Sequence, residues 1–468
     1  MTAAHQAAVV GSTRSRPGPR VPDWWTDLAG SLTWASLLAV VLLWVYGRGL
    51  QHLAGIGSAL VSSGRLAGLL SADLLLLQVL LTARIPFVER AYGQDELLRR
   101  HRVVGFASVV LLVIHIVTLA VGDGLQVGID PVRQTVAFVR DYPGMWWALV
   151  ATGFFLLVIV SSLVVARRHL QYETWHLLHL YAYLGVGLSL PHEVASGADF
   201  VSSPAARTYW WSLYAVAAGS MLIWRVAVPL WRTARHRLVV DEVVAEGAGI
   251  VSVYMKGRHL DRLGAHGGQF FTWRFLDGHG WTRGHPYSLS AAPNADRLRI
   301  TVKALGPGSR RLAKVRPGAR VLIEGPYGRL HPGVSHGARV TLIASGIGIT
   351  PIRALLEEFA PTGADITLIY RASTSEDQVF HEEIETLAAG CGAHVHHVLG
   401  PRLRSRPSWL PESAASLSDS QALQRYAPQV ADSDVYICGT PAWAAAVRAA
   451  ARAAGVPAPR IHLEAFSW

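Results

Sequence analysis

Six long apolar runs in the first half of the chain constrain its fold more than any other feature. They lie at about 31–47, 66–83, 103–121, 145–166, 174–192 and 208–230. Each run approaches the roughly 20 residues that a helix needs to cross the hydrocarbon core of a bilayer. The lipid interior offers the backbone no hydrogen bonds, so these runs predict a bundle of six membrane-spanning helices.

Composition divides the chain into a membrane half and a soluble half. The mean hydropathy of +0.28 and the hydrophobic content of 51% are too high for an ordinary soluble enzyme, yet 16% of the 468 residues are charged. Only two cysteines are present, Cys391 and Cys438, which excludes a disulfide framework and a zinc cage. Because the sequence has no Cys-x-x-Cys-His motif, any haem would be of the non-covalent b type.

Arginine-rich segments alternate with arginine-poor ones along the membrane half, and this alternation predicts its orientation. Residues 1–30 have no apolar core and are expected to form a disordered cytoplasmic tail. The loops after the second, fourth and sixth runs are also arginine-rich, which predicts a multi-pass cell-membrane protein with both termini in the cytoplasm. The net charge of +11 is assigned to the anionic membrane face and to cofactor phosphates, and no nucleic-acid partner is expected.

Four histidines lie in the third and fifth apolar runs, where an imidazole is unfavourable unless it has a strong partner. His101 and His115 are 14 residues apart, which is about 21 Å along a helix and within ~40° of the same face. His179 and His192 are about 20 Å apart and match the first pair in depth. Two stacked haems, each bound by two neutral imidazoles, would explain this arrangement.

The spacing of the histidines leaves alternatives open. Each histidine could instead be a polar residue buried against another helix, although four histidines at matched depths favour haem. On an ideal helix His192 points about 140° away from His179, so the fifth helix must bend or change its pitch. Gly185, Gly187 and Pro191 permit such a bend.

Three segments of the membrane half resemble the ferric reductase-like transmembrane domain of NADPH oxidases, ferric reductases and bacterial relatives. They are RIPFVERAYGQD at 84–95, HRVVG at 101–105 and WHLLHLYAY at 175–183. The resemblance implies two b-type haems, the inner one on His101 and His179 and the outer one on His115 and His192. In the third segment, a tryptophan followed by three residues and a histidine selects His179, and His176 remains the second candidate for that ligand.

From about residue 237 the pattern changes to short alternating or β-branched runs separated by turns. Six of them predict a small antiparallel β-barrel: 237–244, 250–257, 268–275, 285–290, 297–305 and 320–328. Further along, strands alternate with helices up to a last strand at 460–466. That alternation predicts a parallel, doubly wound α/β sheet of nucleotide-binding type.

A barrel followed by such a sheet resembles the ferredoxin–NADP reductase superfamily. The resemblance implies an FAD-binding barrel at 233–332 and an NAD(P)-binding domain at 336–468, after the six-helix membrane domain at 31–230. In the flavin motif His285 would face the pyrophosphate, Tyr287 would pack on the isoalloxazine and Ser288 would hydrogen-bond near flavin N5. The other matched flavin-binding positions are Pro286, Leu289, Lys303, Gly308 and Ser309.

Motifs in the last third match the nucleotide-binding positions of the same superfamily. The turn at 346–351 follows a strand and opens a helix, so that helix N-terminal amides can face a pyrophosphate. Its matched residues are Gly346, Gly348, Thr350 and Pro351. Cys438 and Gly439 match the pair that approaches the nicotinamide, where a glycine allows close contact. Phe466 matches the aromatic residue that shields the flavin until nicotinamide displaces it.

The nicotinamide cofactor is expected to be NADPH. No acidic residue ends the second strand of the nucleotide sheet, where NAD enzymes often hold the ribose 2′-hydroxyl. Arg371 stands there instead and could pair with a 2′-phosphate. An exposed loop arginine would look the same in the sequence, so NADH remains the alternative.

Together these features predict a transmembrane flavocytochrome. Electrons would pass from cytoplasmic NAD(P)H to FAD, then through the two haems to a small-molecule acceptor on the outer side. Oxygen as acceptor would make the protein a superoxide-producing oxidase, and ferric chelate would make it a ferric reductase. A third alternative is an electron-relay subunit that reduces a partner protein. A fourth is a reductase on an unrelated, haem-free membrane anchor.

Overall fold

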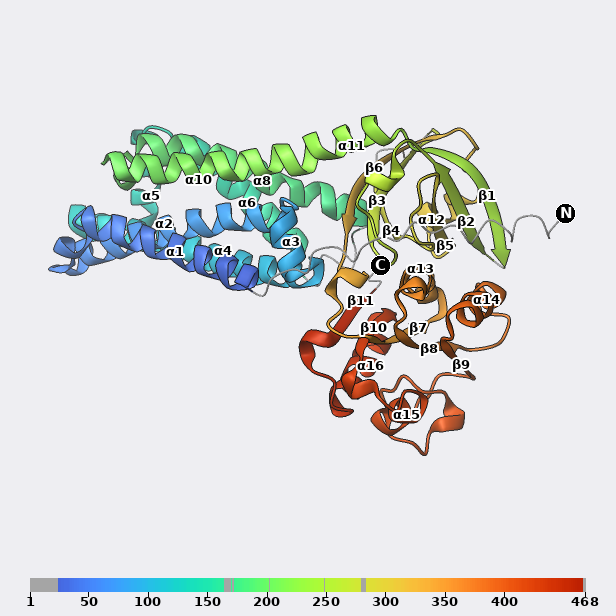
Figure 1. Ribbon diagram of the computed structural model, residues 1–468. Coiled ribbons are helices and arrows are strands. Elements are labelled where there is room, and N and C mark those ends of the chain that lie inside the picture. Colours follow the sequence, from blue (N-terminus) through green and yellow to red (C-terminus); the bar gives the residue numbers. More distant parts are fainter. Residues whose placement is uncertain are drawn as a thin grey trace. The chain divides into compact units, whose positions relative to one another are not determined.

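The computed structural model describes residues 24–163, 170, 172–201, 203–247, 249–278 and 283–465. These residues form two compact units, a helical one that ends at Arg225 and one of strands and helices that begins at Val226 (Figure 1). The predicted tail up to residue 23 and the predicted flavin-shielding Phe466 lie outside the described residues.

Each apolar run of the sequence corresponds to one long helix. The long helices are α1 (Trp24–Tyr46), α2 (Ile56–Thr82), α4 (Gln94–Val127), α6 (Met145–Ser162), α8 (Tyr172–Ala195) and α10 (Pro204–Leu222). Shorter helices lie between them: η2 (Gly49–Leu53), α3 (Pro86–Tyr92), α5 (Pro131–Asp141) and α9 (Ala198–Val201). A π-helical turn, η3 (Ile223–Ala227), continues α10 into α11 (Val228–His236).

The first helix starts earlier than the sequence predicts. Residues 24–30 were expected in the disordered tail, but α1 begins at Trp24. Trp24, Trp25 and Leu28 extend its apolar surface by two turns, and a longer apolar helix spans the bilayer more fully.

Five helices of the described residues are long and apolar enough to cross a membrane. They are Trp24–Tyr46, Ile56–Thr82, Glu96–Val127, Met145–Ser162 and Pro204–His236. The remaining predicted span is α8, which has the length but carries three histidines and Glu193 among its apolar residues. The count of six spans therefore stays a prediction.

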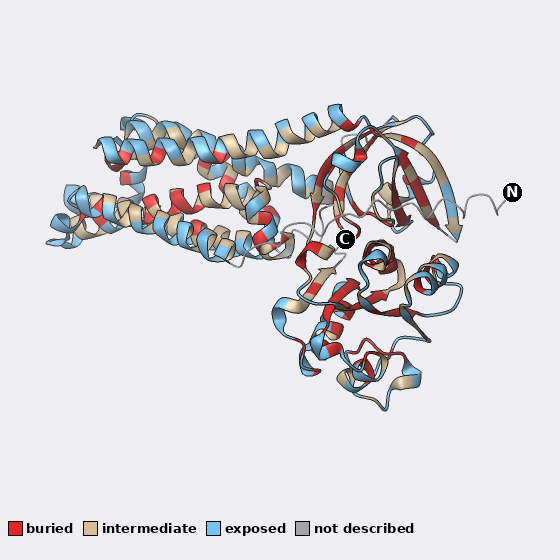
Figure 2. Ribbon diagram, viewed as in Figure 1, coloured by how far each residue is buried: buried red, intermediate tan, exposed pale blue. Residues whose placement is uncertain are grey.

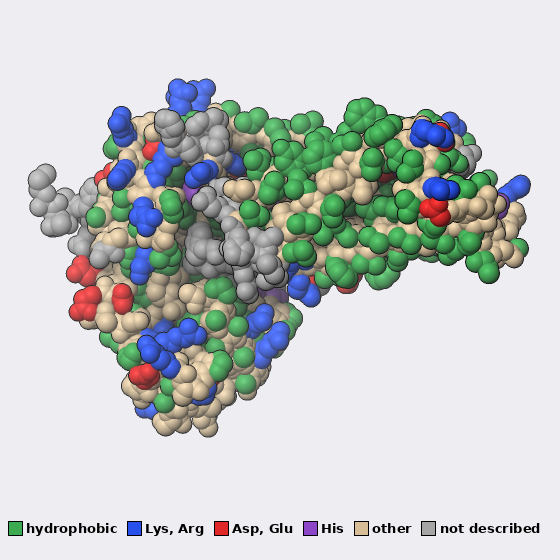
Figure 3. Space-filling model, turned by 180° about the vertical axis from the view of Figure 1, so that it is seen from behind, with side chains coloured by type: hydrophobic (Ala, Val, Ile, Leu, Met, Phe, Trp, Pro, Cys, Tyr) green, Lys and Arg blue, Asp and Glu red, His purple; other side chains and the backbone are tan. Residues whose placement is uncertain are grey.

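The helical unit exposes the apolar side chains that a soluble protein would bury. Trp34 and Phe106 are 74% and 75% exposed. In the space-filling view, hydrophobic side chains cover most of the visible helical surface, and buried residues are sparse along these helices (Figures 2 and 3). A surface of this kind is suited to lipid rather than water. Between the helices, a small core includes Val40, Leu76 and Trp210.

The second unit begins with a six-stranded antiparallel sheet whose order is β4-β3-β6-β1-β2-β5. The strands are β1 (Val239–Gly247), β2 (Ile250–Lys256), β3 (Phe270–Leu276), β4 (His285–Ser288), β5 (Arg297–Lys303) and β6 (Arg320–Tyr327). Short helices between them are η4 (Leu260–Arg262) and α12 (Pro307–Leu312). A bridge pairs Leu289, just after β4, with Ile300 of β5, so the two edge strands approach each other. All six predicted strands are present.

After η5 (Pro332–Val334), five parallel strands form a second sheet in the order β11-β10-β7-β8-β9. They are β7 (Arg339–Ser345), β8 (Asp365–Ala372), β9 (His394–Leu399), β10 (Asp434–Gly439) and β11 (Ile461–Ala465). The helices around this sheet are α13 (Ile349–Phe359), α14 (His381–Cys391), α15 (Asp419–Tyr426) and α16 (Pro441–Ala453).

Alternating strand residues bury both faces of the parallel sheet, as a doubly wound sheet requires. Leu342 and Leu368 pack in a core with α13 and α14. Ile343 and Ile369, one position further along the same strands, pack in a second core with α15 and α16. The predicted parallel, doubly wound sheet is thereby confirmed.

Candidate cofactor-binding sites

Helices α4 and α8 bring histidines from distant parts of the sequence together. The ring centroids of His101 and His179 lie 6.0 Å apart with an angle of 61° between the rings. His115 and His192, the second predicted pair, lie further along the same two helices, one on each. The structure therefore shows a direct ring contact for the first predicted pair.

His115 is held in an orientation suited to metal binding. Its Nδ1 lies 2.9 Å from the carbonyl oxygen of Gly64, so Nδ1–H donates there and Nε2 carries the lone pair. A backbone carbonyl in this role is a common way of fixing the tautomer of a metal-binding histidine. Gly68 makes close contact with this ring, since a Cβ there would lie 2.4 Å from His115 Nδ1.

Buried ring nitrogens without partners fit the same interpretation. Among the described residues, Nδ1 of His101 and Nδ1 of His192 are buried and make no hydrogen bond. A buried polar nitrogen without a partner is unfavourable, and ligation would remove that penalty. Gln78 lies beside the first of these rings, with its Nε2 3.4 Å from His101 Nε2. The imidazoles present therefore fit two bis-histidine haems.

The environment of His179 separates it from its neighbour His176. Trp175 packs on the His179 ring with centroids 5.2 Å apart. Ser162 lies 3.4 Å from His179 Nδ1 and accepts a hydrogen bond from Trp175 Nε1 at 3.4 Å. It is His179 whose ring faces His101. These contacts distinguish His179 from His176.

Two further carboxylates of the helical unit, Asp73 and the partly buried Glu193, were not predicted from the sequence as functional candidates. Asp73 is fully buried and accepts hydrogen bonds from Ser36 at 2.8 Å and Tyr209 at 2.5 Å. Glu193 follows His192 and accepts a hydrogen bond from Tyr214 at 2.6 Å. Both could have been identified from the sequence, because an acidic residue within or next to an apolar run is a functional candidate.

In the antiparallel sheet, the segment from His285 to Leu289 forms β4 and the residue after it. Tyr287 is buried and lies 5.9 Å from the His285 ring, nearly parallel to it. Burial raises the pKa of the Tyr287 hydroxyl, which stays neutral. The hydroxyl of Ser288 is buried and has no hydrogen-bond partner among the described residues. A flavin nitrogen at this position would supply the missing partner, so the segment fits a flavin.

The second predicted flavin segment lies next to the first. A Cβ on Gly308 would lie 2.4 Å from His285 Cε1, so the glycine allows these segments to meet. A small cavity beside them is lined in part by Arg283, whose charge suits a phosphate, and by Arg311, which is paired with Asp277. Ser309, a predicted flavin-binding residue, is already engaged within its own turn. Its hydroxyl accepts hydrogen bonds from Leu305 N and Gly306 N and donates to Gly306 O, and so closes its own turn. Lys303 ends β5 and is exposed.

The two predicted nucleotide motifs meet at the carboxyl ends of β7 and β10. A Cβ on Gly348 would lie 2.4 Å from Cys438 O and 3.0 Å from Gly439 N. Gly346 adopts a φ of +54°, which a residue with a side chain adopts only with strain. The edge where parallel strands end and a helix begins is where such sheets bind dinucleotides. Thr350 and Pro351, the other predicted residues of this turn, are buried in the first turn of α13.

Cys438 is fully buried, and burial raises the pKa of its thiol, so it stays protonated. It is therefore unsuited to act as a nucleophile. A Cβ on Gly439 would lie 2.6 Å from the Trp443 ring, which shows how closely the chain is packed where nicotinamide is expected.

The geometry of Arg371 does not support its predicted role at a 2′-phosphate. The side chain is 5% exposed, and its guanidinium donates to the carbonyl oxygens of Val398, Gly400 and Pro401 at 3.3, 2.7 and 3.2 Å, as well as to its neighbour Ala372. Those carbonyls occupy the donors that a phosphate would need. The sequence could place Arg371 at the end of β8 but could not show which way its side chain turns.

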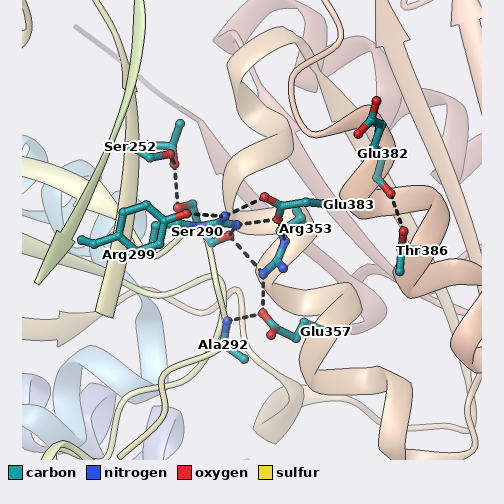
Figure 4. A network of polar contacts seen from close by, with 11 residues as sticks. Ser252, Ser290, Ala292, Arg299, Arg353, Glu357, Glu382, Glu383 and Thr386 are labelled. Carbon is teal, nitrogen blue, oxygen red and sulfur yellow. Dashed lines mark hydrogen bonds and ion pairs between the residues drawn. The ribbon is translucent and has the colours of Figure 1, made fainter. Parts of the chain in front are cut away.

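A buried ionic network joins the flavin segment to the nucleotide-binding sheet (Figure 4). Arg299 of β5 donates to both carboxylate oxygens of Glu383 on α14, at 2.9 and 3.0 Å. Arg353 of α13 also pairs with Glu383, at 2.9 Å, and with Glu357. Both arginines are only 6% exposed. The sequence does not predict this network, because its members are far apart in the chain.

The network also holds the backbone directly after the flavin motif. Arg299 donates to Ser290 O at 2.8 Å, and Glu357 accepts a hydrogen bond from Ala292 N at 2.7 Å. The helix α13, which begins at the predicted pyrophosphate turn, is thereby fixed to the strand that carries the flavin motif.

Family models match both halves of the chain. Residues 67–190 match the ferric reductase like transmembrane component, and residues 342–449 match the oxidoreductase NAD-binding domain. The helical unit thus contains a ferric reductase-like membrane domain, and the parallel-sheet part contains an oxidoreductase NAD-binding domain. The chain is a membrane oxidoreductase whose second unit is of the FAD- and NAD(P)-binding ferredoxin reductase type, an arrangement that implies electron transfer across the membrane.

Relatives of the chain match different parts of it. Ferredoxin–NADP reductase B of Sorangium cellulosum is 28% identical over 189 residues, which are 38% of this chain and 77% of the relative. Human dual oxidase 2 is 22% identical over 306 residues, 59% of this chain but only 19% of the relative. A solved FAD/NAD-binding domain of a Vibrio cholerae nitric oxide dioxygenase, at 25% identity, covers 50% of this chain and 99% of that domain with a TM-score of 0.39.

Proposed function

We propose that the protein moves electrons from cytoplasmic NAD(P)H through FAD and two b-type haems to an acceptor on the outer side of the membrane. The observation that carries the proposal is the meeting of His101 of α4 with His179 of α8, whose ring centroids lie 6.0 Å apart. Bound FAD would accept a hydride and release single electrons, and bound haems would relay them.

The residues of the soluble unit would bind and orient the first two cofactors. Tyr287 would pack against the flavin ring, and the Ser288 hydroxyl, which lacks a partner among the described residues, would hydrogen-bond to it. The turn from Gly346 to Gly348 would bring helix amides to the nicotinamide cofactor's pyrophosphate. Gly439 would allow the nicotinamide to approach closely. NADPH remains the favoured form, on the absence of an acidic residue at the end of β8.

The remaining structural proposals follow from the same elements. We infer six spans, with α8 as the fifth, because a helix that carries two haem ligands must lie within the bundle. We infer that the antiparallel sheet closes into a barrel, supported by the Leu289–Ile300 bridge and by the Ser290 N to Arg299 O hydrogen bond of 2.8 Å. The arginine-rich loops favour both termini in the cytoplasm. We keep 31–230, 233–332 and 336–468 as the proposed limits of the membrane, FAD-binding and NAD(P)-binding domains.

The terminal acceptor is proposed to be a small molecule, either oxygen, giving superoxide, or a ferric chelate. The test uses the full-length protein in detergent with NADPH and one acceptor at a time. Reduction of b-type haem bands by NADPH, followed by their reoxidation, is the expected result. Superoxide-dismutase-sensitive reduction of a dye would identify oxygen, and ferrous iron formed without oxygen would identify ferric chelate. The absence of b-type bands would refute the haem relay and favour a reductase on a haem-free anchor.

An electron-relay subunit that reduces a partner protein is the second candidate. It is favoured by the relatives of the soluble unit, one of which is named as a ferredoxin–NADP reductase. NADPH oxidation that proceeds with neither oxygen nor ferric chelate, but only after a ferredoxin is added, would support this candidate over the first.

A further inference from the structure

Two groups among the described residues combine histidines with a carboxylate outside the proposed cofactor sites. One is His336, Asp434 and His462, and the other is His381, Glu385 and His397. In each group the ligand-type atoms lie within 4.8 Å of one another. They differ in what the carboxylate already binds, and this difference decides which group can accept an ion.

The Asp434 carboxylate is occupied by the protein itself. It is fully buried and accepts hydrogen bonds from the backbone N–H groups of His336 and Gly337 at 2.7 and 2.9 Å and from the Ser335 hydroxyl at 3.1 Å. The His336 and His462 rings both point to its remaining oxygen, at 3.2 and 3.0 Å. Five donors already satisfy this carboxylate, so the group is a structural link between strands.

The second group is open to solvent and comes from two adjacent elements. His381 and Glu385 are four residues apart on α14 and therefore share one face of the helix. His397 lies on β9, which neighbours this helix (Figure 1). The side chains of Glu385 and His397 are 50% and 21% exposed, and His381 is exposed, so an ion could enter from water.

The side chains of this group already converge. Glu385 Oε1 lies 2.7 Å from His397 Nε2, and the His381 and His397 ring centroids lie 4.7 Å apart. On its other side, His397 Nδ1 lies 2.6 Å from the amide of Gln378. The amide nitrogen of Gln378 donates to Nδ1, so His397 Nε2–H donates to Glu385, and a bound ion would take the place of that proton between the imidazole and the carboxylate.

We propose that His381, Glu385 and His397 bind a divalent transition-metal ion, for which Zn²⁺ is the best match. Two imidazole nitrogens and one carboxylate oxygen are a known ligand set for zinc, which takes a water at its fourth position. Zinc imposes no strong geometric preference, so small ring rotations suffice to complete the site. The exposed Glu382 adds negative charge on the same helix. The site requires neither FAD nor haem, and it is independent of the proposed electron transfer.

The test measures zinc binding to the full-length protein in detergent after chelator treatment. Isothermal titration and metal analysis of His381→Ala, Glu385→Gln and His397→Ala are compared with wild type. The matched control is His394→Ala, which removes an exposed histidine from the same strand but outside the group. We expect one tight equivalent of zinc in wild type and in the control, with at least tenfold weaker binding in the three variants.

A second readout separates loss of the site from misfolding. Zinc is expected to raise the melting temperature of wild type and of His394→Ala but not of His397→Ala, while the metal-free melting temperatures of the three proteins agree. Equal loss of binding in His394→Ala and His397→Ala would show unspecific binding to imidazoles and overturn the proposal. Unchanged tight binding in all three site variants would overturn it as well.

Discussion

Arg299 and Glu383 form a two-pronged ion pair between β5 and α14, with Nη1–Oε1 and Nη2–Oε2 distances of 2.9 and 3.0 Å. Burial opposes ionisation of Glu383, but the hydrogen bonds and charges of Arg299 and Arg353 outweigh it and lower the pKa of this carboxyl. The pair links the strand after the flavin motif to the helices of the nucleotide-binding sheet. Together with the hydrogen bond from Ala292 N to Glu357, it holds the two proposed cofactor sites in register.

Replacing Glu383 by glutamine tests this role. The change leaves two buried arginines without their shared anion, and we expect a loss of about 2 kcal/mol in unfolding free energy. The loss is smaller than for a fully buried pair because 37% of the Glu383 side chain is exposed. Misalignment of the two segments should also lower the rate of flavin reduction by NADPH about tenfold.

The control for this prediction is Glu382→Gln on the same turn of α14. The Glu382 side chain is exposed, and its backbone carbonyl accepts a hydrogen bond from Thr386 Oγ1 at 2.8 Å. It should resemble wild type in melting temperature and in stopped-flow flavin reduction. If Glu383→Gln reduced flavin as fast as Glu382→Gln, the network would be a stability element without a positioning role.

The choice between His179 and His176 can be made by haem analysis. His179→Ala and His115→Ala are each expected to lose about half of the b-type haem, because each removes one ligand of a different pair. His176→Ala is the matched control and should keep the full haem content and the wild-type reduced-minus-oxidised spectrum. The reverse pattern, with haem lost in His176→Ala and kept in His179→Ala, would transfer the ligand to His176.

Gly348→Ala should disrupt the site where the two nucleotide motifs meet. The new Cβ would lie 2.4 Å from a backbone carbonyl oxygen of Cys438, which cannot move aside as a flexible side chain would. We expect lower stability by about 1–3 kcal/mol and a raised KM for NADPH. Gly390→Ala serves as control, because Gly390 lies in α14 with no atom within 4 Å of an added Cβ. The Gly390→Ala variant should have unchanged or slightly higher stability. An equal effect of both substitutions on the KM for NADPH would contradict the assignment of Gly348 to the nucleotide-binding site.

Arg371→Gln is expected to destabilise the protein without changing its choice of nucleotide. The guanidinium donates to several backbone carbonyl oxygens, which the shorter side chain would leave unpaired, at a cost of about 2 kcal/mol. The ratio of kcat/KM for NADPH to that for NADH should stay within about twofold of wild type. A tenfold fall in this ratio, which corresponds to about 1.4 kcal/mol, would restore Arg371 as a 2′-phosphate ligand.

The Asp434 carboxylate should make the free energy of unfolding depend on pH. Burial raises the pKa of this carboxyl, but hydrogen bonds from His462 and His336 outweigh burial and lower it from 3.8 to about 2. Because the folded pKa lies below the unfolded one, the stabilisation is complete above about pH 4 and is lost as the pH falls towards 2. Chemical unfolding of wild type and Asp434→Asn at pH 7 and pH 3 measures this, and the difference in stability between them should shrink at pH 3. An unchanged difference would exclude the ionised carboxylate as its source.

The sequence alone determined where the elements lie. Membrane helices follow from the length of apolar runs, and the strands of both sheets follow from alternation and turn residues, all of which are local patterns. The parallel order of the second sheet was also predictable, because alternating strands and helices allow few other arrangements. The start of α1 at Trp24 was missed, because the arginines just before it suggested a tail.

Only the tertiary structure decided which side chains meet and which way they turn. The sequence placed His179 and His176 on one helix, but packing of α8 against its neighbours turns His179 toward His101. It placed Arg371 at the end of a strand, but the carbonyls after β9 draw its guanidinium inward. The Arg299–Glu383 pair joins residues 84 positions apart. Such contacts depend on the relative placement of elements, which is set by the sum of many weak packing interactions rather than by any local pattern.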